Sequence, residues 1–232
     1  MASGSQGMTA FVTIPSGSFL MGSERGQDDE RPVHRVFVDA FALAVFPVTR
    51  AEYSRFLEVG GHEAPRDWQA GEGRPDLPVT GVSWLDAAAY CRWQTGQGNA
   101  VRLPTEAEWE RAARGGVEGA DYPGGDFLPA WLPDGGRGPL AGPWPVTLAP
   151  PNEFGVRGIG GNIHEWCADW HSAGYYAASP ERNPTGPSSG ARRASRGGSW
   201  RHAWTMSRCA QRSKLDPSFR YTDYGFRIAR SV

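Results

Sequence analysis

The sequence has few cysteines, almost no net charge and no long apolar run, and each shortage disfavours a class of protein. Its three cysteines cannot all pair with one another, so a disulfide framework is not expected and a reducing, cytoplasmic compartment is favoured. A formal net charge of −1 provides no general attraction to nucleic acid or to an anionic membrane. No apolar run approaches the roughly 20 residues that span a bilayer. We therefore expect a cytoplasmic protein with neither a nucleic-acid nor a membrane partner.

Glycine, proline and tryptophan are abundant instead. The 232 residues include 31 Gly, 19 Pro and 10 Trp, and 39% of them are hydrophobic. Frequent Gly and Pro interrupt helices and strands, whereas the aromatic residues argue against disorder. A chain of this length suits one large domain. We predict a single α+β domain over residues 11–232 with little regular secondary structure, preceded by a flexible N-terminal segment at residues 1–10.

The first half of the chain carries clear helix starts. A capping residue is followed three positions later by an acidic residue in three places, namely Thr49 with Glu52, Ser83 with Asp86, and Thr105 with Glu108. Apolar residues at helical spacing follow each pair, and Gly115 is positioned to end the third helix. The pattern predicts three helices and none beyond Gly115.

Strand signals are short. Residues 11–15 and 19–22 have strand character, and residues 33–44 alternate in part between the two faces of an extended chain. In the second half only residues 192–195 and 224–229 have such character, because Pro, Gly and Asn dominate the remainder. The sequence therefore predicts long irregular segments after the helices.

The most informative stretch lies in the last third. Gly-Asn-Ile-His-Glu-Trp at 161–166 is followed by Arg-Gly-Gly-Ser-Trp at 196–200 and by Gly-Phe-Arg at 225–227. Glycine adopts backbone conformations that other residues avoid, and Arg and Asn satisfy loose carbonyl groups. Such residues fix irregular loops in place, and fixed loops commonly form sites.

These motifs have counterparts earlier in the chain, and the ordered set resembles the formylglycine-generating enzyme family, also called sulfatase-modifying factors. The earlier members are Ile-Pro-x-Gly-x-Phe-x-Met-Gly at 14–22, Pro-Val-Thr at 47–49, Val-Ser-Trp at 82–84 and Arg-Leu-Pro-Thr-Glu-Ala-Glu-Trp-Glu at 102–110. The resemblance runs from about Phe11 to Ala229. It implies a single C-type-lectin-like domain with bound calcium. In the active enzymes it also implies a copper-dependent oxidase that converts a peptide cysteine of a sulfatase into formylglycine.

The chain departs from that family at the copper site. The resemblance implies two cysteines spaced C-x4-C, of which Cys209 supplies the second, whereas Trp204 stands at the position of the first. No cysteine lies between Trp170 and Arg208 that could replace it. A single thiolate is a poor site for Cu(I), so we expect no formylglycine formation by the family mechanism. The alternative role of Cys209 is that of a small buried hydrophobic residue.

A second departure concerns His164, which stands where the resemblance implies an oxygen-pocket tryptophan. Imidazole and thiolate ligands suit iron, copper or zinc. A cluster of His164, His202 and Cys209 would therefore form a mononuclear catalytic site if the fold brings the three together. A hydrogen-bonded strut in a structured loop is the alternative role of His164.

Calcium is the cofactor that the resemblance implies at residues 161–165. Its ligands would be the backbone carbonyls of Gly161 and Ile163 and the carboxylate of Glu165, because calcium prefers oxygen ligands. Gly158 stands where the family has a further side-chain oxygen, so one ligand is lost. The alternative for Glu165 is a salt bridge to a nearby arginine.

Three functions remain open, each with a peptide, a protein or a small molecule as partner. The first is a divergent metal-dependent oxidase or accessory protein, with iron or copper held by a site that includes His164 and Cys209. The second is a non-catalytic C-type-lectin-like binding module that displays residues 200–224, as in relatives diversified by retroelements. Its ligand-binding residues would be Trp200, His202, Trp204 and Arg208. The third is a true formylglycine-generating enzyme that works without the first cysteine.

Overall fold

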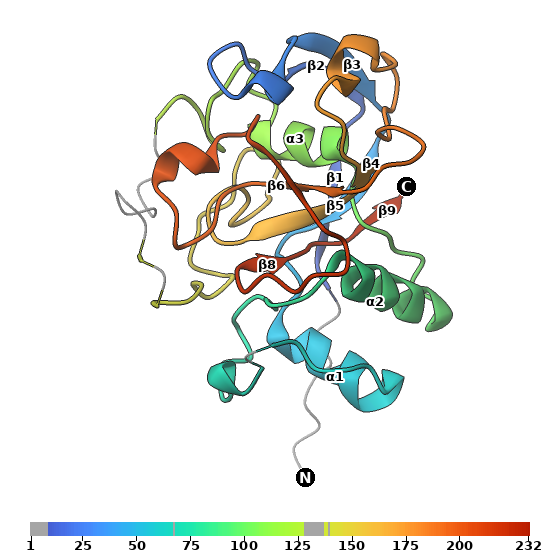
Figure 1. The fold of residues 1–232 in the computed structure, drawn as a ribbon, viewed down its shortest axis with the longest axis vertical. Helices are drawn as coiled ribbons and strands as arrows, with labels where there is room; N and C mark the ends of the chain where they lie inside the picture. The colour runs from blue at the N-terminus through green and yellow to red at the C-terminus, as the bar shows by residue number, and fades with distance from the viewer. Residues whose placement is uncertain (1–8, 67, 128–136, 139) are drawn as a thin grey trace.

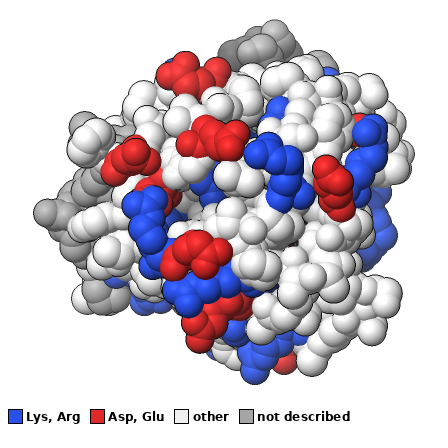
Figure 2. Space-filling model, turned by 90° about the horizontal axis from the view of Figure 1, so that it is seen from above, with Lys and Arg blue, Asp and Glu red and all other residues white. Residues whose placement is uncertain are grey.

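The computed structural model of this chain describes residues 9–66, 68–127, 137–138 and 140–232. Of the predicted flexible segment, residues 1–8 lie outside this part of the chain. Within it, none of the helices combines the length and the apolar character needed to cross a membrane. Figure 2 shows basic and acidic side chains interspersed over one face of the molecule, as a near-neutral composition predicts.

The three predicted helices form where their capping signals place them. They are α1 (Arg50–Gly60), α2 (Trp84–Gly96) and α3 (Glu106–Arg114). In each, the capping side chain accepts the backbone N–H of the third helical residue, and the carboxylate of that residue accepts the backbone N–H of the cap. Gly115 ends α3 at a φ of 61°, a left-handed conformation that glycine adopts at little cost. Four short 3-10 helices accompany them, η1 (Asp28–Glu30), η2 (Trp68–Gly71), η3 (Tyr175–Ala178) and η4 (Trp204–Ser207).

The described strands form three small sheets. The first holds β1 (Phe11–Ile14), β4 (Phe41–Ala44) and β9 (Ala229–Ser231), and the second holds β2 (Gly17–Met21) and β3 (His34–Val38). The third has the order β7 (Arg212–Leu215), β6 (Arg193–Arg196), β5 (His164–Trp170) and β8 (Tyr224–Gly225). All pairings are antiparallel except that of β5 with β8, which is parallel.

Two predictions for the last third need correction. Residues 164–170 were expected to be irregular, yet they form β5, the longest described strand. Their polar and apolar residues do not alternate because the first four are all buried, as in a strand covered on both faces. The single strand predicted over 224–229 is instead divided between β8 and β9, which belong to different sheets. Arg227 lies between them and is fully buried, and the carbonyls of its neighbours Phe226 and Ile228 accept backbone hydrogen bonds from Val48 and Ala44.

Two hydrophobic cores lie on opposite sides of the four-stranded sheet. Figure 1 shows α3 on one side of β5 and β6, and α1 and α2 on the other. The first core includes Trp109 of α3 and Cys167, whereas the second includes Tyr90 of α2, Trp166 and Phe226. Adjacent residues of β5 enter different cores because successive side chains of a strand point to opposite faces. The sheet is therefore held rigidly at the strand that begins with His164.

Buried ion pairs join α3 to this sheet. The guanidinium of Arg196 on β6 contacts the carboxylates of Glu106 and Glu110, and all three side chains are almost completely buried. Arg212 on β7 pairs with Glu106 at 2.7 Å, and Arg114 pairs with Glu110 at 2.6 Å. Each of these five buried charged groups thus has an opposite charge within contact, which a low-dielectric interior requires.

Candidate functional site

A cluster of two histidines and one aspartate lies at the start of β5. Ligand atoms of His164, His202 and Asp223 all lie within 4.8 Å of one another. His164 is the first residue of β5, and Asp223 directly precedes β8, which pairs in parallel with β5. The backbone N–H of His164 donates to the carbonyl of Asp223 at 3.1 Å. The parallel pairing of these strands therefore sets the relative positions of two of the three side chains.

The side chains face one another at short distances. His164 Nε2 lies 3.1 Å from His202 Nδ1 and 4.0 Å from Asp223 Oδ2. His202 Nε2 is also 4.0 Å from the same carboxylate oxygen. Ser199 Oγ donates to Asp223 Oδ2 at 2.8 Å and lies 3.2 Å from His202 Nδ1. The serine hydroxyl thus orients both the carboxylate and the second imidazole.

Burial keeps the imidazoles neutral. His164 and Asp223 are buried, whereas the side chain of His202 is 35% exposed. Burial lowers the pKa of His164 to about 4, an effect that the nearby Asp223 carboxylate opposes without cancelling. Burial also lowers the pKa of His202. At neutral pH each ring is therefore uncharged and keeps one unprotonated nitrogen, which is the form of histidine that binds metal ions.

Two imidazoles and one carboxylate form a recognised set of metal ligands. Such a set leaves coordination positions open and is typical of non-haem Fe(II) enzymes. The exposed side of His202 provides access from solvent. The contact between His164 and His202 is also a hydrogen bond in its own right, so the alternative role of His164 as a strut is compatible with the same geometry.

Cys209 is not the third member of this cluster, as the sequence had suggested. The structure brings His164 and His202 together, but Asp223 completes the group. Cys209 is fully buried in the core beside α3, and its carbonyl accepts a hydrogen bond from Arg196 at 2.8 Å. Burial raises the pKa of its thiol to about 12, so the thiolate form is disfavoured at neutral pH. This is the environment of a small hydrophobic residue.

The side chains present do not fit a two-thiolate copper site. All three cysteines are free and buried, and no cysteine stands at the position that the resemblance implies for the first copper ligand. Trp204, at the position of the missing cysteine, begins η4 and packs its ring 5.3 Å from that of Tyr122. We therefore assign no copper chemistry to this pair of positions.

Glu165 makes the salt bridge that was the alternative to calcium binding. Its carboxylate is completely buried and accepts hydrogen bonds from Arg227 Nε at 2.6 Å and Arg227 Nη2 at 2.8 Å. Trp109 Nε1 donates to the same carboxylate at 2.8 Å. A calcium ion held by the carbonyls of Gly161 and Ile163 would have to share a carboxylate that an arginine already neutralises. Calcium at this loop stays a prediction.

The predicted ligand-binding residues lie in different environments. Trp200 is 5% exposed, and Arg208 forms a two-pronged ion pair with Glu30 at 2.7 and 2.8 Å. Both therefore contribute to the packing of the protein. His202 belongs to the cluster described above, and Trp204 is half-buried. His202, Trp204 and Arg208 are all partly exposed, so a role for them in ligand binding stays a prediction.

Sequence reasoning missed Asp223 and Ser199. Each directly adjoins or lies within a motif that had been singled out, Asp223 just before the strand that leads to Gly-Phe-Arg and Ser199 inside Arg-Gly-Gly-Ser-Trp. Their polar side chains beside glycine-rich motifs were the available signal. Nothing in the spacing indicates that they meet, because 24 positions separate them along the chain.

Comparison with known proteins gives one consistent family. The family described as the sulfatase-modifying factor enzyme 1-like domain matches residues 2–232. The serine/threonine-protein kinase pkn1 of Chlamydia caviae is 36% identical over 244 residues, which cover 97% of this chain but only 38% of that protein. The formylglycine-generating enzyme of Streptomyces coelicolor is 34% identical over 287 residues, covering 95% of this chain and 89% of that enzyme.

A solved structure agrees with the sequence comparison. PvdO from Pseudomonas aeruginosa superimposes with a TM-score of 0.81 at 29% identity, covering 96% of this chain and 94% of that one. The mixed α and β architecture predicted from the motifs, with its C-type-lectin-like core, is therefore confirmed. The chain belongs to the sulfatase-modifying factor family, which includes the formylglycine-generating enzymes.

Proposed function

We propose that this chain is a divergent, metal-dependent oxidase of its family that acts on a peptide or a small molecule. The observation that supports this function is the convergence of His164, His202 and Asp223 beside the irregular loops of the last third. Two of the three side chains are buried, which is unusual for polar residues without a structural or functional role. Trp204 in place of the first cysteine of the family argues against the copper chemistry of the family.

The residues around the cluster have separable tasks in this proposal. A first-row metal such as Fe(II), once bound, would supply open positions for oxygen and substrate. Tyr224 stacks on the His164 ring with centroids 4.5 Å apart and thereby fixes its orientation. Ser199 holds the Asp223 carboxylate, and Arg201 lies 3.9 Å from its other oxygen. Such partners around metal ligands set the direction and the basicity of those ligands.

Metal content is the direct test of the proposal. The purified protein, loaded with Fe(II) without oxygen and then desalted, should retain about one metal ion per chain by elemental analysis. His164→Ala and Asp223→Asn should each lower metal affinity by at least about tenfold, because each removes a ligand. His62→Gln is the matched control, since His62 is a histidine outside the cluster that contacts Asp86. The proposal would be contradicted if both cluster variants retained the metal. It would also be contradicted if the His62→Gln control lost as much metal as they do.

Calcium at the 161–165 loop is a separate proposal with a separate readout. It draws support from the family resemblance and from the two backbone carbonyls, whereas the ion pair of Glu165 with Arg227 opposes it. A ligand that binds only the folded state raises the melting temperature. A rise on adding calcium that persists in His164→Ala would support a calcium site outside the cluster. An unchanged melting curve after chelation and after calcium addition would eliminate it.

A non-catalytic binding module is the second candidate function. The segment at 200–224 lies partly on the surface, where Phe219 is 51% exposed and packs at 4.7 Å from Tyr221. Exposed aromatic rings of this kind are common in ligand-binding surfaces. In this function His164 is a strut, and ligand binding is the same with and without metal. The metal analysis above therefore separates the two candidates.

The proposed compartment is the cytoplasm. Its support is that all three thiols are free and none is positioned in a disulfide. Mass measurement of the protein from its native host, after alkylation without reduction, tests this directly. Three alkylated cysteines are expected.

A further inference from the structure

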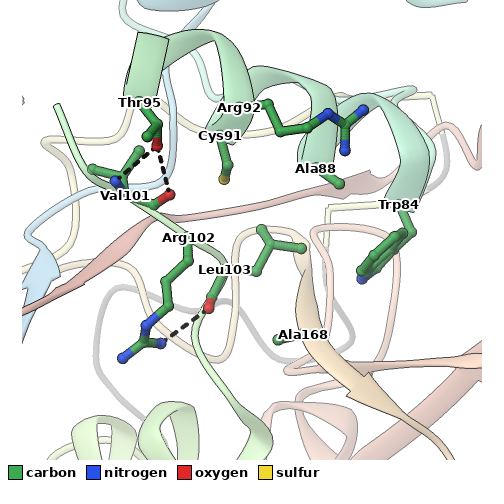
Figure 3. Close-up of a pocket in the computed structure, with 9 residues that line it drawn as sticks. All are labelled: Trp84, Ala88, Cys91, Arg92, Thr95, Val101, Arg102, Leu103 and Ala168. Carbon is green, nitrogen blue, oxygen red and sulfur yellow. Dashed lines mark hydrogen bonds between the residues drawn. The ribbon is translucent and has the colours of Figure 1, made fainter. Parts of the chain in front are cut away.

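A groove of about 400 Å³ lies between α2 and the segment that follows it, away from the histidine cluster. Trp84, Ala88 and Cys91 line it from α2, and Val101 and Leu103 line it from the facing segment (Figure 3). Ala168 of β5 closes one side. The volume lies within the range of about 300–1,000 Å³ that is usual for small-molecule sites, and the walls are mainly apolar.

One cation of this groove has no opposite charge. Arg92 is exposed and makes no ion pair or side-chain hydrogen bond with any described residue. Figure 3 shows its guanidinium extending along α2 past Ala88 towards Trp84. Arg102, the other arginine of the lining, is neutralised by Glu108 at 2.6 and 2.7 Å and points towards the Leu103 carbonyl. None of the described residues that line the groove is an Asp or a Glu, so the charge of this lining is positive.

The Cys91 thiol in the groove is suited to van der Waals contact with a ligand and not to covalent reaction with it. Cys91 is 6% exposed, and burial raises the pKa of its thiol to about 12 although the charge of Arg92 acts in the opposite direction. It therefore adds a small polarizable surface to the apolar wall. A non-covalent ligand is expected.

We infer that this groove binds an amphiphilic carboxylate, with its hydrocarbon part on the apolar walls and its carboxylate on Arg92. Removing apolar surface from water stabilises the complex in proportion to the area that is buried. A guanidinium and a carboxylate form charge-assisted hydrogen bonds, which are stronger than those between neutral groups. The apolar walls select the body of the ligand, and the uncompensated arginine selects the sign of its charge.

The site is independent of the histidine cluster. Ala168 and His164 both lie on β5, but Trp166 stands between them and is fully buried in the second core. Loss of metal binding therefore leaves the groove unchanged, and the inference does not rest on the proposed function.

Calorimetric titration with decanoate, and with the neutral 1-decanol as its comparison, tests the inference. Decanoate should bind saturably with a stoichiometry of one and more tightly than decanol. Arg92→Gln should weaken decanoate by about tenfold and leave decanol unchanged, because one charged contact is lost. Ala88→Phe should abolish both by filling the groove. Arg35→Gln is the matched control, since Arg35 lies on β3 and makes only a loose contact of 3.8 Å with Glu118.

The outcomes are distinguishable. Saturable binding that depends on Arg92 and on the space beside Ala88 supports the site, provided that melting curves show the variants to be folded. The inference is overturned by the absence of saturable binding or by equal affinity for decanoate and decanol. It is also overturned by an Arg92→Gln variant that binds decanoate as well as the Arg35→Gln control does.

Discussion

His164 is held from three directions. Its ring stacks on Tyr224, its Nε2 contacts His202, and its backbone N–H donates to the carbonyl of Asp223. Burial removes the proton that would otherwise compete with a metal ion, because the charged ring is poorly solvated there. At the scale of single residues, the features required of a metal ligand are therefore present in His164. They are missing in Cys209, because burial raises the pKa of its thiol and disfavours the thiolate that would bind a metal.

The residue scale also carries a prediction about activity. Given Cu(I), oxygen and a peptide with a Cys-x-Pro-x-Arg motif, the protein should form no formylglycine above background, since soft two-thiolate ligation is absent. Trp204→Cys alone should not restore the activity, because Cys209 remains in a core that excludes the substrate. Mass spectrometry of the peptide measures the thiol-to-aldehyde change, and the Streptomyces coelicolor enzyme is the positive control. Formylglycine from the unaltered chain would show that the active site lies elsewhere.

At the scale of elements, the N-terminus of α2 joins local and distant parts of the chain. Asp86 completes the cap of Ser83 and also accepts hydrogen bonds from Arg220 Nε at 2.8 Å and from His62 Nε2 at 2.7 Å. Burial alone would raise the pKa of Asp86, but the hydrogen bonds from Arg220, Ser83 and His62 outweigh it and hold this pKa at about 2. The helix start thus depends on the ionised carboxylate.

The pH dependence of this contact can be predicted with its sign. A carboxylate whose folded pKa lies below its unfolded value stabilises the protein above the unfolded pKa, and this stability is lost as pH falls through the folded pKa. Asp86→Asn should therefore lower the free energy of unfolding by about 2 kcal/mol at pH 7. The difference from the unaltered protein should shrink between about pH 4 and about pH 2.

Urea unfolding over a pH series measures this difference. Asp76→Asn is the control, because Asp76 is 47% exposed and makes only a loose contact of 3.6 Å with Arg74. A constant difference between the Asp86→Asn variant and the unaltered protein across this pH range would contradict the prediction.

At the scale of the whole molecule, Arg227 connects segments that are distant in the sequence. Besides its pair with Glu165 on β5, it donates to the carbonyls of Ala44 at 3.1 Å and Arg157 at 3.2 Å. Both charged side chains are fully buried. Regular elements are short in this fold, so such buried polar contacts take over part of the role that long helices and strands have elsewhere.

Breaking this pair should be costly. Glu165→Gln leaves the Arg227 charge buried without compensation, and we expect a loss of about 3–5 kcal/mol in the free energy of unfolding. Glu165→Gln combined with Arg227→Met should lose less than the sum of the single changes, because the unpaired charge is then absent. Chemical denaturation of the four proteins measures the coupling. The exposed pair Arg35 and Glu118 is the control, with an expected cost below about 1 kcal/mol. Strict additivity at Glu165 and Arg227 would count against a coupled buried pair.

The sequence by itself determined two kinds of feature. They are those that depend on residues close together in the chain and those that depend on the number or order of residues of a given type. The three helix starts follow from side chains that cap a backbone three residues away, so Thr49, Ser83 and Thr105 could be assigned without a fold. The missing thiolate follows from Trp204 and from the number of cysteines. The family follows from motifs in a fixed order, and the family match over residues 2–232 confirms it.

Only the tertiary structure decided which polar residues meet. Asp223 joins His164 because β8 pairs with β5, and Arg208 forms an ion pair with Glu30 although 178 positions separate the two. Strand β5 was missed because burial on both faces removes the alternation that marks a strand in the sequence. Contacts between residues that are distant in the sequence depend on which backbone segments pair. The spacing of residues along the chain does not reveal that pairing.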